Sequence, residues 1–412
     1  MSIAENHGGL YQNLKELRDT EGRSSCNFFR SLGLDYLYVG EGNDIPSLVA
    51  AFAKVKDTSR PTVVHIHTQK GKGYAPAEAD REEFHWEMPF DLETGKPKVD
   101  CSGMEDYHSL TGKFLLEKMK EGHTVVAISS GTPTVIGFTP ERRKQAGRQF
   151  VDVGIAEEHA VALASGIAAG GGRPVYGVYS TFIQRCYDQL SQDLCINGNP
   201  AVITVFMGTV AGMNDVTHLG FFDIPLISNI PNMVYLAPTC SEEYFAMLEW
   251  AVRQTEYPVA IRVPGVAVVH RKEEFDTDYS ELNRYKMTAR GETVAILALG
   301  SFYDLGQALK NKLREESGVE ATLINPRYIT GLDEPMLEEL KVGHRIVVTL
   351  EDGVLDGGFG EKIARYYGNS EMRVLNYGLR KEFADRYNLD ELMKANRLTD
   401  KQMAEDIAGI LE

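Results

Sequence analysis

The sequence is poor in cysteine, and the cysteines it has form no recognisable framework. The five are Cys26, Cys101, Cys186, Cys195 and Cys240, and no two of them stand as Cys-x-x-Cys. An odd number of scattered thiols indicates reduced cysteines rather than disulfides or a structural zinc site. The protein is therefore expected to be cytoplasmic.

Long apolar runs and an excess of positive charge are missing too. No stretch approaches the roughly 18 apolar residues that span a bilayer, and residues 1–12, MSIAENHGGLYQ, lack the basic and apolar regions of a signal peptide. Lys and Arg number 43 against 59 Asp and Glu, which gives a net charge of -16. Such a charge repels nucleic acids and anionic membranes, so we expect neither as a partner.

The order of the apolar runs predicts an α/β protein in three blocks, since 412 residues suffice for two or three domains. Residues 1–104 show one buried-looking strand, at 62–68, and are expected to be part of a larger domain. Residues 105–270 alternate short apolar runs with helical spans, which is typical of a parallel sheet covered on both faces. A polar linker at 271–288 leads to a smaller α/β domain at 289–412.

The strands of the two larger blocks can be placed individually. They are expected at 124–129, 150–153, 175–179, 201–206, 233–237 and 259–263, and then at 293–299, 320–324, 345–350 and 373–376.

The chemistry is densest between residues 150 and 189. One strand ends at Gly154, and Glu157 and Glu158 then open a helix, while the next strand ends at Tyr179 and leads to Phe182. An enzyme that must protonate and stack a flat heterocycle needs such a carboxylate and aromatic ring. Taken alone, Glu157 is about equally well explained as an acid in the first turn of a helix, where the macrodipole favours it.

The runs IAEEHAV (155–161) and YSTFIQRCYDQ (179–189) resemble the transketolase family of thiamine-diphosphate enzymes, with the closest likeness to its 1-deoxy-D-xylulose-5-phosphate synthase branch. The resemblance implies a thiamine-diphosphate-binding fold, a C-terminal transketolase domain and a homodimer. It implies that Glu157 hydrogen-bonds the aminopyrimidine ring and that Phe182 packs on it. An acid there shifts the ring toward its imino tautomer, whose nitrogen can take the proton from thiazolium C2.

The same resemblance implies a reaction and further site residues. Synthases of this branch transfer a two-carbon unit from pyruvate to the aldehyde glyceraldehyde 3-phosphate, for isoprenoid precursor synthesis. Tyr74, in the turn KGKGY, matches a tyrosine that touches the cofactor, although the bare pattern also fits a basic surface turn. His85 and His218 match histidines that face the substrates and are candidates for proton transfer. Tyr179, Arg185, Asn214 and Asp215 are expected to bind substrate.

The acceptor side departs from the family pattern. Asn214 stands where the family has an aspartate, with Asp215 one position later, and an amide cannot do the proton work of a carboxylate. Met207 and Gly265 stand where the synthases have arginines for the phosphate of the acceptor, and each lost contact removes about 1.5–3 kcal/mol. The acceptor is therefore left open between glyceraldehyde 3-phosphate and, in a transketolase-like paralogue, a different aldehyde.

The motifs that hold Mg²⁺ and the diphosphate in the family are also missing. Neither a GDG motif nor an NDN-like turn occurs in the sequence, and residues 1–6 resemble the family sequence just after that turn. By this likeness the backbone carbonyl of Met1 would be a Mg²⁺ ligand. The preferred explanation is truncation, because a break within a sheet exposes an apolar edge. The alternatives are a complementing N-terminal chain and a non-catalytic subunit.

Overall fold

The computed structural model describes residues 8–85, 89–99, 103–265 and 267–411. The chain divides into two compact units, residues 1–104 and residues 105–412.

The first unit is built on a two-stranded parallel sheet of β1 (Asp35–Val39) and β2 (Thr62–Ile66). Five short helices accompany it: α2 (Gly8–Asp19), α3 (Phe28–Ser31), α4 (Ile45–Val55), α5 (Ala75–Ala79) and η1 (Glu83–His85). The prediction of a single strand in this block was wrong. The segment DYLYV has the aromatic and β-branched residues of a strand, but its partner lies 27 residues along the chain, which a local pattern does not reveal.

The second unit contains a six-stranded sheet in which every pairing is parallel. Its strand order is β4-β3-β5-β6-β8-β7. The strands are β3 (Val125–Ser129), β4 (Phe150–Asp152), β5 (Arg173–Tyr179), β6 (Val202–Phe206), β7 (Val234–Leu236) and β8 (Val259–Arg262). All six lie where the sequence predicts strands, because continuous apolar runs are what a sheet buried on both faces requires.

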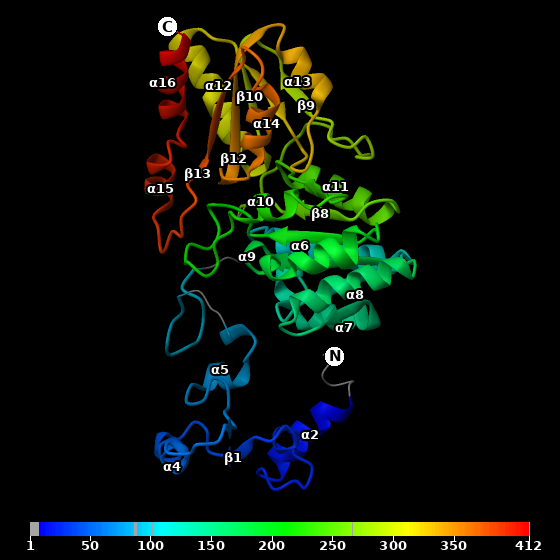
Figure 1. The fold of residues 1–412 in the computed structure, drawn as a ribbon, viewed down its shortest axis with the longest axis vertical. Coiled ribbons are helices and arrows are strands. Elements are labelled where there is room, and N and C mark those ends of the chain that lie inside the picture. Colours follow the sequence, from blue (N-terminus) through cyan, green and yellow to red (C-terminus); the bar gives the residue numbers. More distant parts are fainter. Residues whose placement is uncertain (1–7, 86–88, 100–102, 266, 412) are drawn as a thin grey trace. The chain divides into compact units, whose positions relative to one another are not determined.

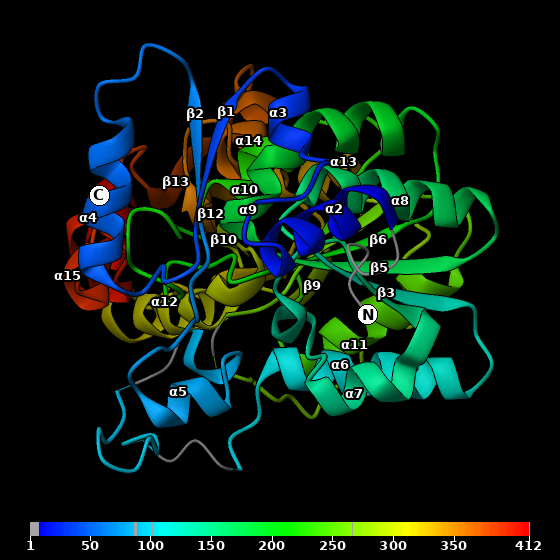
Figure 2. The same cartoon turned by 90° about the horizontal axis from the view of Figure 1, so that it is seen from below.

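Helices cover both faces of this sheet. On one face α8 (Glu157–Ala169) and the π-helix Gln189–Cys195 pack on Tyr176 and Ile203. On the other face α6 (Tyr107–Lys120) and α11 (Ser241–Arg253) pack on Val175 and Val202. Neighbouring residues of one strand thus enter different cores, and Figure 2 shows α8 and α6 on opposite sides of β3, β5 and β6.

A mixed five-stranded sheet follows in the order β13-β12-β10-β11-β9. The strands are β9 (Lys286–Ala289), β10 (Thr293–Ala298), β11 (Thr322–Asn325), β12 (His344–Val354) and β13 (Arg373–Leu379). Figure 1 shows α12 (Tyr303–Ser317) and α14 (Phe359–Tyr367) flanking this sheet, while α13 (Glu334–Leu340), α15 (Leu389–Ala395) and α16 (Asp400–Leu411) complete the domain. The sequence does not predict β9, a partly exposed antiparallel edge strand. The α/β fold class is confirmed.

Candidate active site

Three loops that are distant in sequence meet at one edge of the six-stranded sheet. Because β4, β5 and β6 are parallel, their carboxyl ends share this edge, which is where ligands bind in open α/β sheets. Glu157 begins the helix after β4, Phe182 lies in α9 (Ser180–Ile183) directly after β5, and His218 lies in the loop after β6. The sequence placed all three at strand ends, and the parallel topology makes them neighbours.

Glu157 is buried and paired with Arg185. Its side chain is 3% exposed, and Arg185, itself 48% exposed, donates from Nη1 to Oε2 over 3.0 Å. The same guanidinium lies over the ring of Phe182, 5.9 Å from its centroid. A buried carboxylate needs such a partner, because an uncompensated charge is costly in the interior. The arginine expected to bind substrate therefore contacts both of the residues expected to bind the cofactor.

Phe182 joins the remaining aromatic groups of the site. Its ring centroid is 5.9 Å from that of Tyr179 and 5.5 Å from that of His218, both edge to face. Burial raises the pKa of Tyr179 above its ordinary value, so this residue stays a neutral phenol. The cluster presents an aromatic wall beside the buried acid.

Asp215 orients His218. Its Oδ1 accepts hydrogen bonds from the backbone and hydroxyl of Thr217 and faces Nδ1 of His218 at 3.1 Å. These contacts, with Thr217 first and His218 second, lower the pKa of Asp215 to about 2. A carboxylate on Nδ1 fixes the ring and leaves Nε2 as the nitrogen for a substrate.

Asn214 connects the site loop to the C-terminal domain. Its side-chain Nδ2 donates to the backbone carbonyl oxygen of Tyr387 over 3.1 Å. Its backbone carbonyl oxygen accepts from the backbone N–H of Arg386 over 2.6 Å. The hydroxyl of Tyr387 in turn donates to the carbonyl oxygen of Val210 over 2.7 Å. The amide that the sequence assigned to substrate thus anchors the loop to the backbone of another domain.

The sequence reading missed a buried ion pair beneath this loop. Arg262 donates from Nε to Asp223 over 2.7 Å, and from Nη2 to the carbonyl oxygens of Gly220, over 3.1 Å, and Asp352, over 2.6 Å. Asp223 also accepts from Ser180, the first residue of α9, over 2.9 Å. Burial alone would lower the pKa of Arg262, but the nearby carboxylates outweigh it and the pKa is raised. The sequence held one signal of this ion pair, because Arg262 is a single charged residue at the end of the apolar strand VAIR.

Neither position of the missing arginines offers a charge. Met207 packs against the core and has a φ of 56°, and a Cβ added at Gly265 would meet nothing within 4 Å. The guanidinium of Arg262 donates from Nε and Nη2 to Asp223 and to the carbonyl oxygens of Gly220 and Asp352. The acceptor side of this edge therefore lacks the guanidinium groups that the resemblance would place at these two positions.

Two candidate residues lie in the first unit. The ring of Tyr74 packs near Phe84 and Phe90, at centroid distances of 5.6 and 5.9 Å, and its buried hydroxyl has no partner among the described residues. His85 is exposed, with Nδ1 2.7 Å from Nζ of Lys70. The roles of Tyr74 and His85 stay predictions, and Met1 lies outside the described residues.

The described residues contain no metal cluster. Among them, no group of three or more His, Cys, Asp or Glu side chains could hold a metal ion. No helix in the described ranges is long and apolar enough to cross a membrane.

The buried acid follows β4 and the aromatic residue follows β5, the next strand along the chain, on a parallel sheet that a mixed-sheet domain follows. This arrangement is typical of the pyrimidine-binding class of thiamine-diphosphate proteins. Family models agree: residues 105–268 match the pyrimidine-binding domain of transketolase, and residues 284–403 match the transketolase C-terminal domain. The chain belongs to the transketolase family.

Individual relatives are 1-deoxy-D-xylulose-5-phosphate synthases. That of Clostridium acetobutylicum is 34% identical over 394 residues, covering 93% of this chain and 60% of the relative, and that of Clostridium tetani is 33% identical over 408 residues, covering 98% and 65%. The chain thus spans about three fifths of the length of these curated relatives.

Solved structures share the fold at low identity. One described as a split-gene transketolase, inactive beta4 tetramer, is 21% identical with a TM-score of 0.62, covering 74% of this chain and 98% of its own. A transketolase variant from Pichia stipitis is 15% identical with a TM-score of 0.60, covering 92% and 67%.

Proposed function

We propose that this chain provides the pyrimidine-binding side of a thiamine-diphosphate enzyme that transfers a two-carbon unit from pyruvate to an aldehyde. The observation that carries the proposal is the buried carboxylate of Glu157 within one connected cluster with Phe182, Arg185 and His218. The identity to the synthases, at 34%, supports the same reaction type.

The residues of the site fit the aminopyrimidine ring. Glu157 can hydrogen-bond a ring nitrogen, because its carboxyl group is buried at the strand end and its partner Arg185 is half-exposed. Phe182 and Tyr179 shield that ring from water, and His218, held by Asp215, moves a proton at the substrate. The cofactor, when bound, supplies the carbanion nucleophile.

The described residues do not fit Mg²⁺ and the diphosphate, because no group of three or more His, Cys, Asp or Glu among them could hold a metal ion. The first unit leaves α4 with an exposed apolar stripe of Ile45, Val49 and Phe52, at 72%, 63% and 48% exposure, and its described sheet has two strands. We propose that further polypeptide completes this sheet and supplies the metal ligands. The likeness to a split-gene transketolase supports a separate complementing chain, and truncation of a single longer chain is the other source.

A second candidate concerns the acceptor. Met207 and Gly265 favour an aldehyde that is not held through a phosphate, which would make the protein a transketolase-like paralogue. Steady-state assays of the completed enzyme with glyceraldehyde 3-phosphate and glyceraldehyde distinguish the two. A clear preference for the phosphorylated aldehyde would overturn the paralogue.

The pyrimidine site can be tested without the diphosphate side. The probe is 4-amino-5-hydroxymethyl-2-methylpyrimidine, with binding followed by NMR titration of the 412-residue chain. Glu157→Gln should weaken binding about tenfold or more, because a hydrogen bond to a charged group contributes about 1.5–3 kcal/mol. Its exposed neighbour provides the matched control, Glu158→Gln, which should bind like the wild type. Equal affinity of wild type and Glu157→Gln would refute the assignment.

Calorimetry with thiamine diphosphate and Mg²⁺ addresses the non-catalytic alternative. A chain that needs a complementing polypeptide should bind the complete cofactor weakly by itself. Tight binding by this chain alone would rule out the need for a partner.

A further inference from the structure

The amino ends of the strands form the edge of the six-stranded sheet opposite to the candidate active site, and we call it the amino edge. A cavity of about 560 Å³ lies where β6, β7 and β8 begin, and the connection before β9 and the turn at Thr330 and Gly331 close it on the other side. This volume falls within the roughly 300–1,000 Å³ of small-molecule sites. Nothing in the proposed reaction uses it.

The lining combines amides and hydroxyls with an apolar wall. The polar side chains are those of Asn197, Ser228, Asn229, Asn232, Asn283 and Thr330, with the single carboxylate of Glu256. Ile230 and Tyr257 contribute apolar surface, and neither Lys nor Arg lines the cavity among the described residues. Such a wall suits an uncharged molecule that both donates and accepts hydrogen bonds, whereas an anion would find a carboxylate and no cation.

The polar groups of the lining differ in how far they are already engaged, and Nδ2 of Asn232 donates to the carbonyl oxygen of Cys195 over 3.4 Å. Ser228 is 9% exposed, and its buried hydroxyl has no hydrogen-bond partner among the described residues. Asn232 and Asn283 both have a φ of 64°, a left-handed conformation that asparagine tolerates better than most residues. The amide of Asn283 packs so closely on Gly331 that a Cβ there would lie 2.1 Å from its Cγ. An unsatisfied buried hydroxyl is uncommon and calls for a partner.

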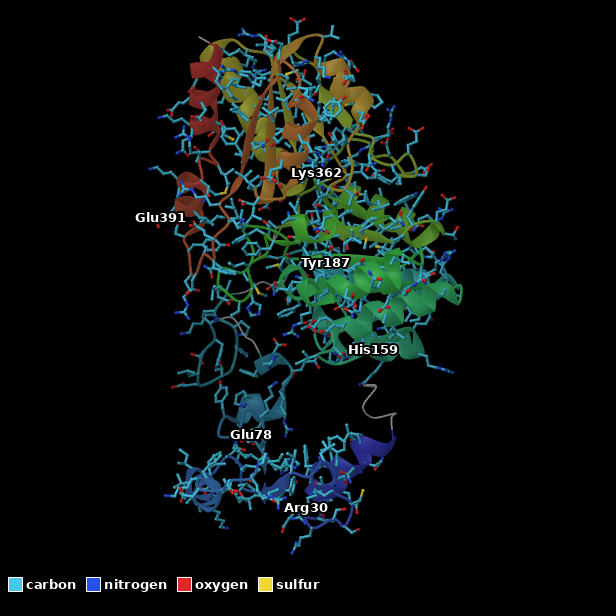
Figure 3. All side chains as sticks on the ribbon, viewed as in Figure 1. Arg30, Glu78, His159, Tyr187, Lys362 and Glu391 are labelled. Atoms are coloured by element: carbon cyan, nitrogen blue, oxygen red, sulfur yellow. The ribbon has the colours of Figure 1, made fainter. Side chains whose placement is uncertain are left out.

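The cavity wall shares two elements with the catalytic edge. The helix α10 (Asp223–Ser228) begins at the aspartate that holds Ser180 and ends at the serine of the cavity. Asn229 accepts a hydrogen bond from the hydroxyl of Tyr187 over 2.8 Å, and Tyr187, labelled in Figure 3, follows Arg185 by two residues. A ligand in the cavity would therefore touch elements that also position the site.

We propose that this cavity binds an uncharged, sugar-sized polyol, at a site separate from the thiamine site. Vicinal hydroxyls would pair with the amides of Asn232 and Asn283 and with the hydroxyl of Ser228, and the C–H face of the ring would lie against Tyr257. The proposal does not depend on the reaction that the catalytic edge performs.

Saturation-transfer NMR of the 412-residue chain with D-ribose, D-xylose and myo-inositol tests the proposal, with D-ribose 5-phosphate as the charged comparison. At least one uncharged probe should bind, and the phosphate ester should bind about tenfold more weakly or not at all. Absence of binding for all three uncharged probes, or equal binding of the phosphate ester, would overturn the proposal.

Variants locate the binding. Asn232→Gly and Asn283→Gly remove the amides while keeping a residue that accepts the left-handed backbone, so both should fold and each should weaken binding about five- to tenfold. Asn369→Gly, at an exposed asparagine outside the lining, should have no effect. Arg185→Gln distinguishes the catalytic edge: if it abolishes binding while the cavity variants leave binding intact, the sugar sits at the catalytic edge and the proposal is wrong.

Discussion

Replacing Arg262 by methionine should loosen the whole catalytic edge. The substitution keeps an unbranched apolar stem but removes the guanidinium, and it leaves Asp223, which is 1% exposed, without its cation. It also removes the donors to the carbonyl oxygens of Gly220 and Asp352, and so one of the links between the site loop and the C-terminal domain. Removing one partner of a buried ion pair costs about 3–5 kcal/mol, because the remaining charge stays desolvated.

A double variant separates the effect of the uncompensated charge from the effect of the altered packing. In Arg262→Met with Asp223→Asn, the carboxylate that paired with Arg262 is neutral. The amide can accept from one of the two hydroxyls that Asp223 now binds, Ser180 and Tyr235, through its oxygen and donate to the other through its nitrogen. The double variant should therefore be more stable than the single one, although it contains more substitutions.

Native-state hydrogen exchange is the suitable assay, because a chain of two compact units need not unfold in one step. The backbone N–H of Val263, bonded to the carbonyl oxygen of Val205 over 2.9 Å, reports on the affected strands. Its exchange should accelerate by about two to four powers of ten, which corresponds to the expected loss of about 3–5 kcal/mol. The exposed Arg253→Met, whose ion-pair distance is 3.9 Å, should change stability by about 0.5 kcal/mol or less. An effect of Arg262→Met below about 1 kcal/mol, or a double variant no better than the single one, would refute the reasoning.

Three further predictions concern acceptor choice, pH and the site loop. Gly265→Arg enters open space and should raise the kcat/KM ratio of phosphorylated to unphosphorylated aldehyde about tenfold; an unchanged ratio would contradict it. Burial raises the pKa of Glu351 to about 7, so the native state keeps a proton that the unfolded state has released. Stability should then fall as the pH rises from about 4 to about 7 and level off above that, whereas Glu351→Gln should remove this dependence in thermal melts at several pH values; an unchanged slope would contradict it. Tyr387→Phe removes the hydrogen bond to Val210 and should speed hydrogen exchange in residues 207–220 about fivefold, while unchanged exchange would show that the contact does not hold the loop.

Most of the fold could be predicted because burial on both faces leaves a strong trace in a sequence. Strands such as β6, every residue of which is buried, must be apolar throughout. The strands β1 and β9 were not predicted from the sequence. They belong to a two-stranded sheet and to a sheet edge, and their residues are mostly half-buried or exposed. Local pattern carries little information there, since pairing with a distant partner decides the conformation.

The candidate site was predictable in its residues but not in its contacts. Glu157, Phe182 and His218 stand at strand ends, and any parallel sheet brings such positions to one edge. The pairing of Arg185 with Glu157 depends on side-chain direction between the 3-10 helix Gln184–Cys186 and the first turn of α8, which spacing does not encode. Asn214 and Asp215 illustrate the same limit: the first anchors the loop and the second orients the histidine, although they are adjacent in sequence.

The sequence by itself determined the α/β class, the family and the acid and aromatic residues of the site, because these follow from local composition and from short runs of specific residues. Only the tertiary structure decided which polar side chains remain available to bind a cofactor or a substrate. Arg262 is committed to a buried ion pair, Asn214 to the backbone of another domain, and the cavity at the amino edge exists only because several separate segments meet there. Hydrogen bonds and desolvation depend on which groups lie close together in space, and such groups can be far apart in the sequence. The final role of a polar residue is therefore fixed by its surroundings in the fold.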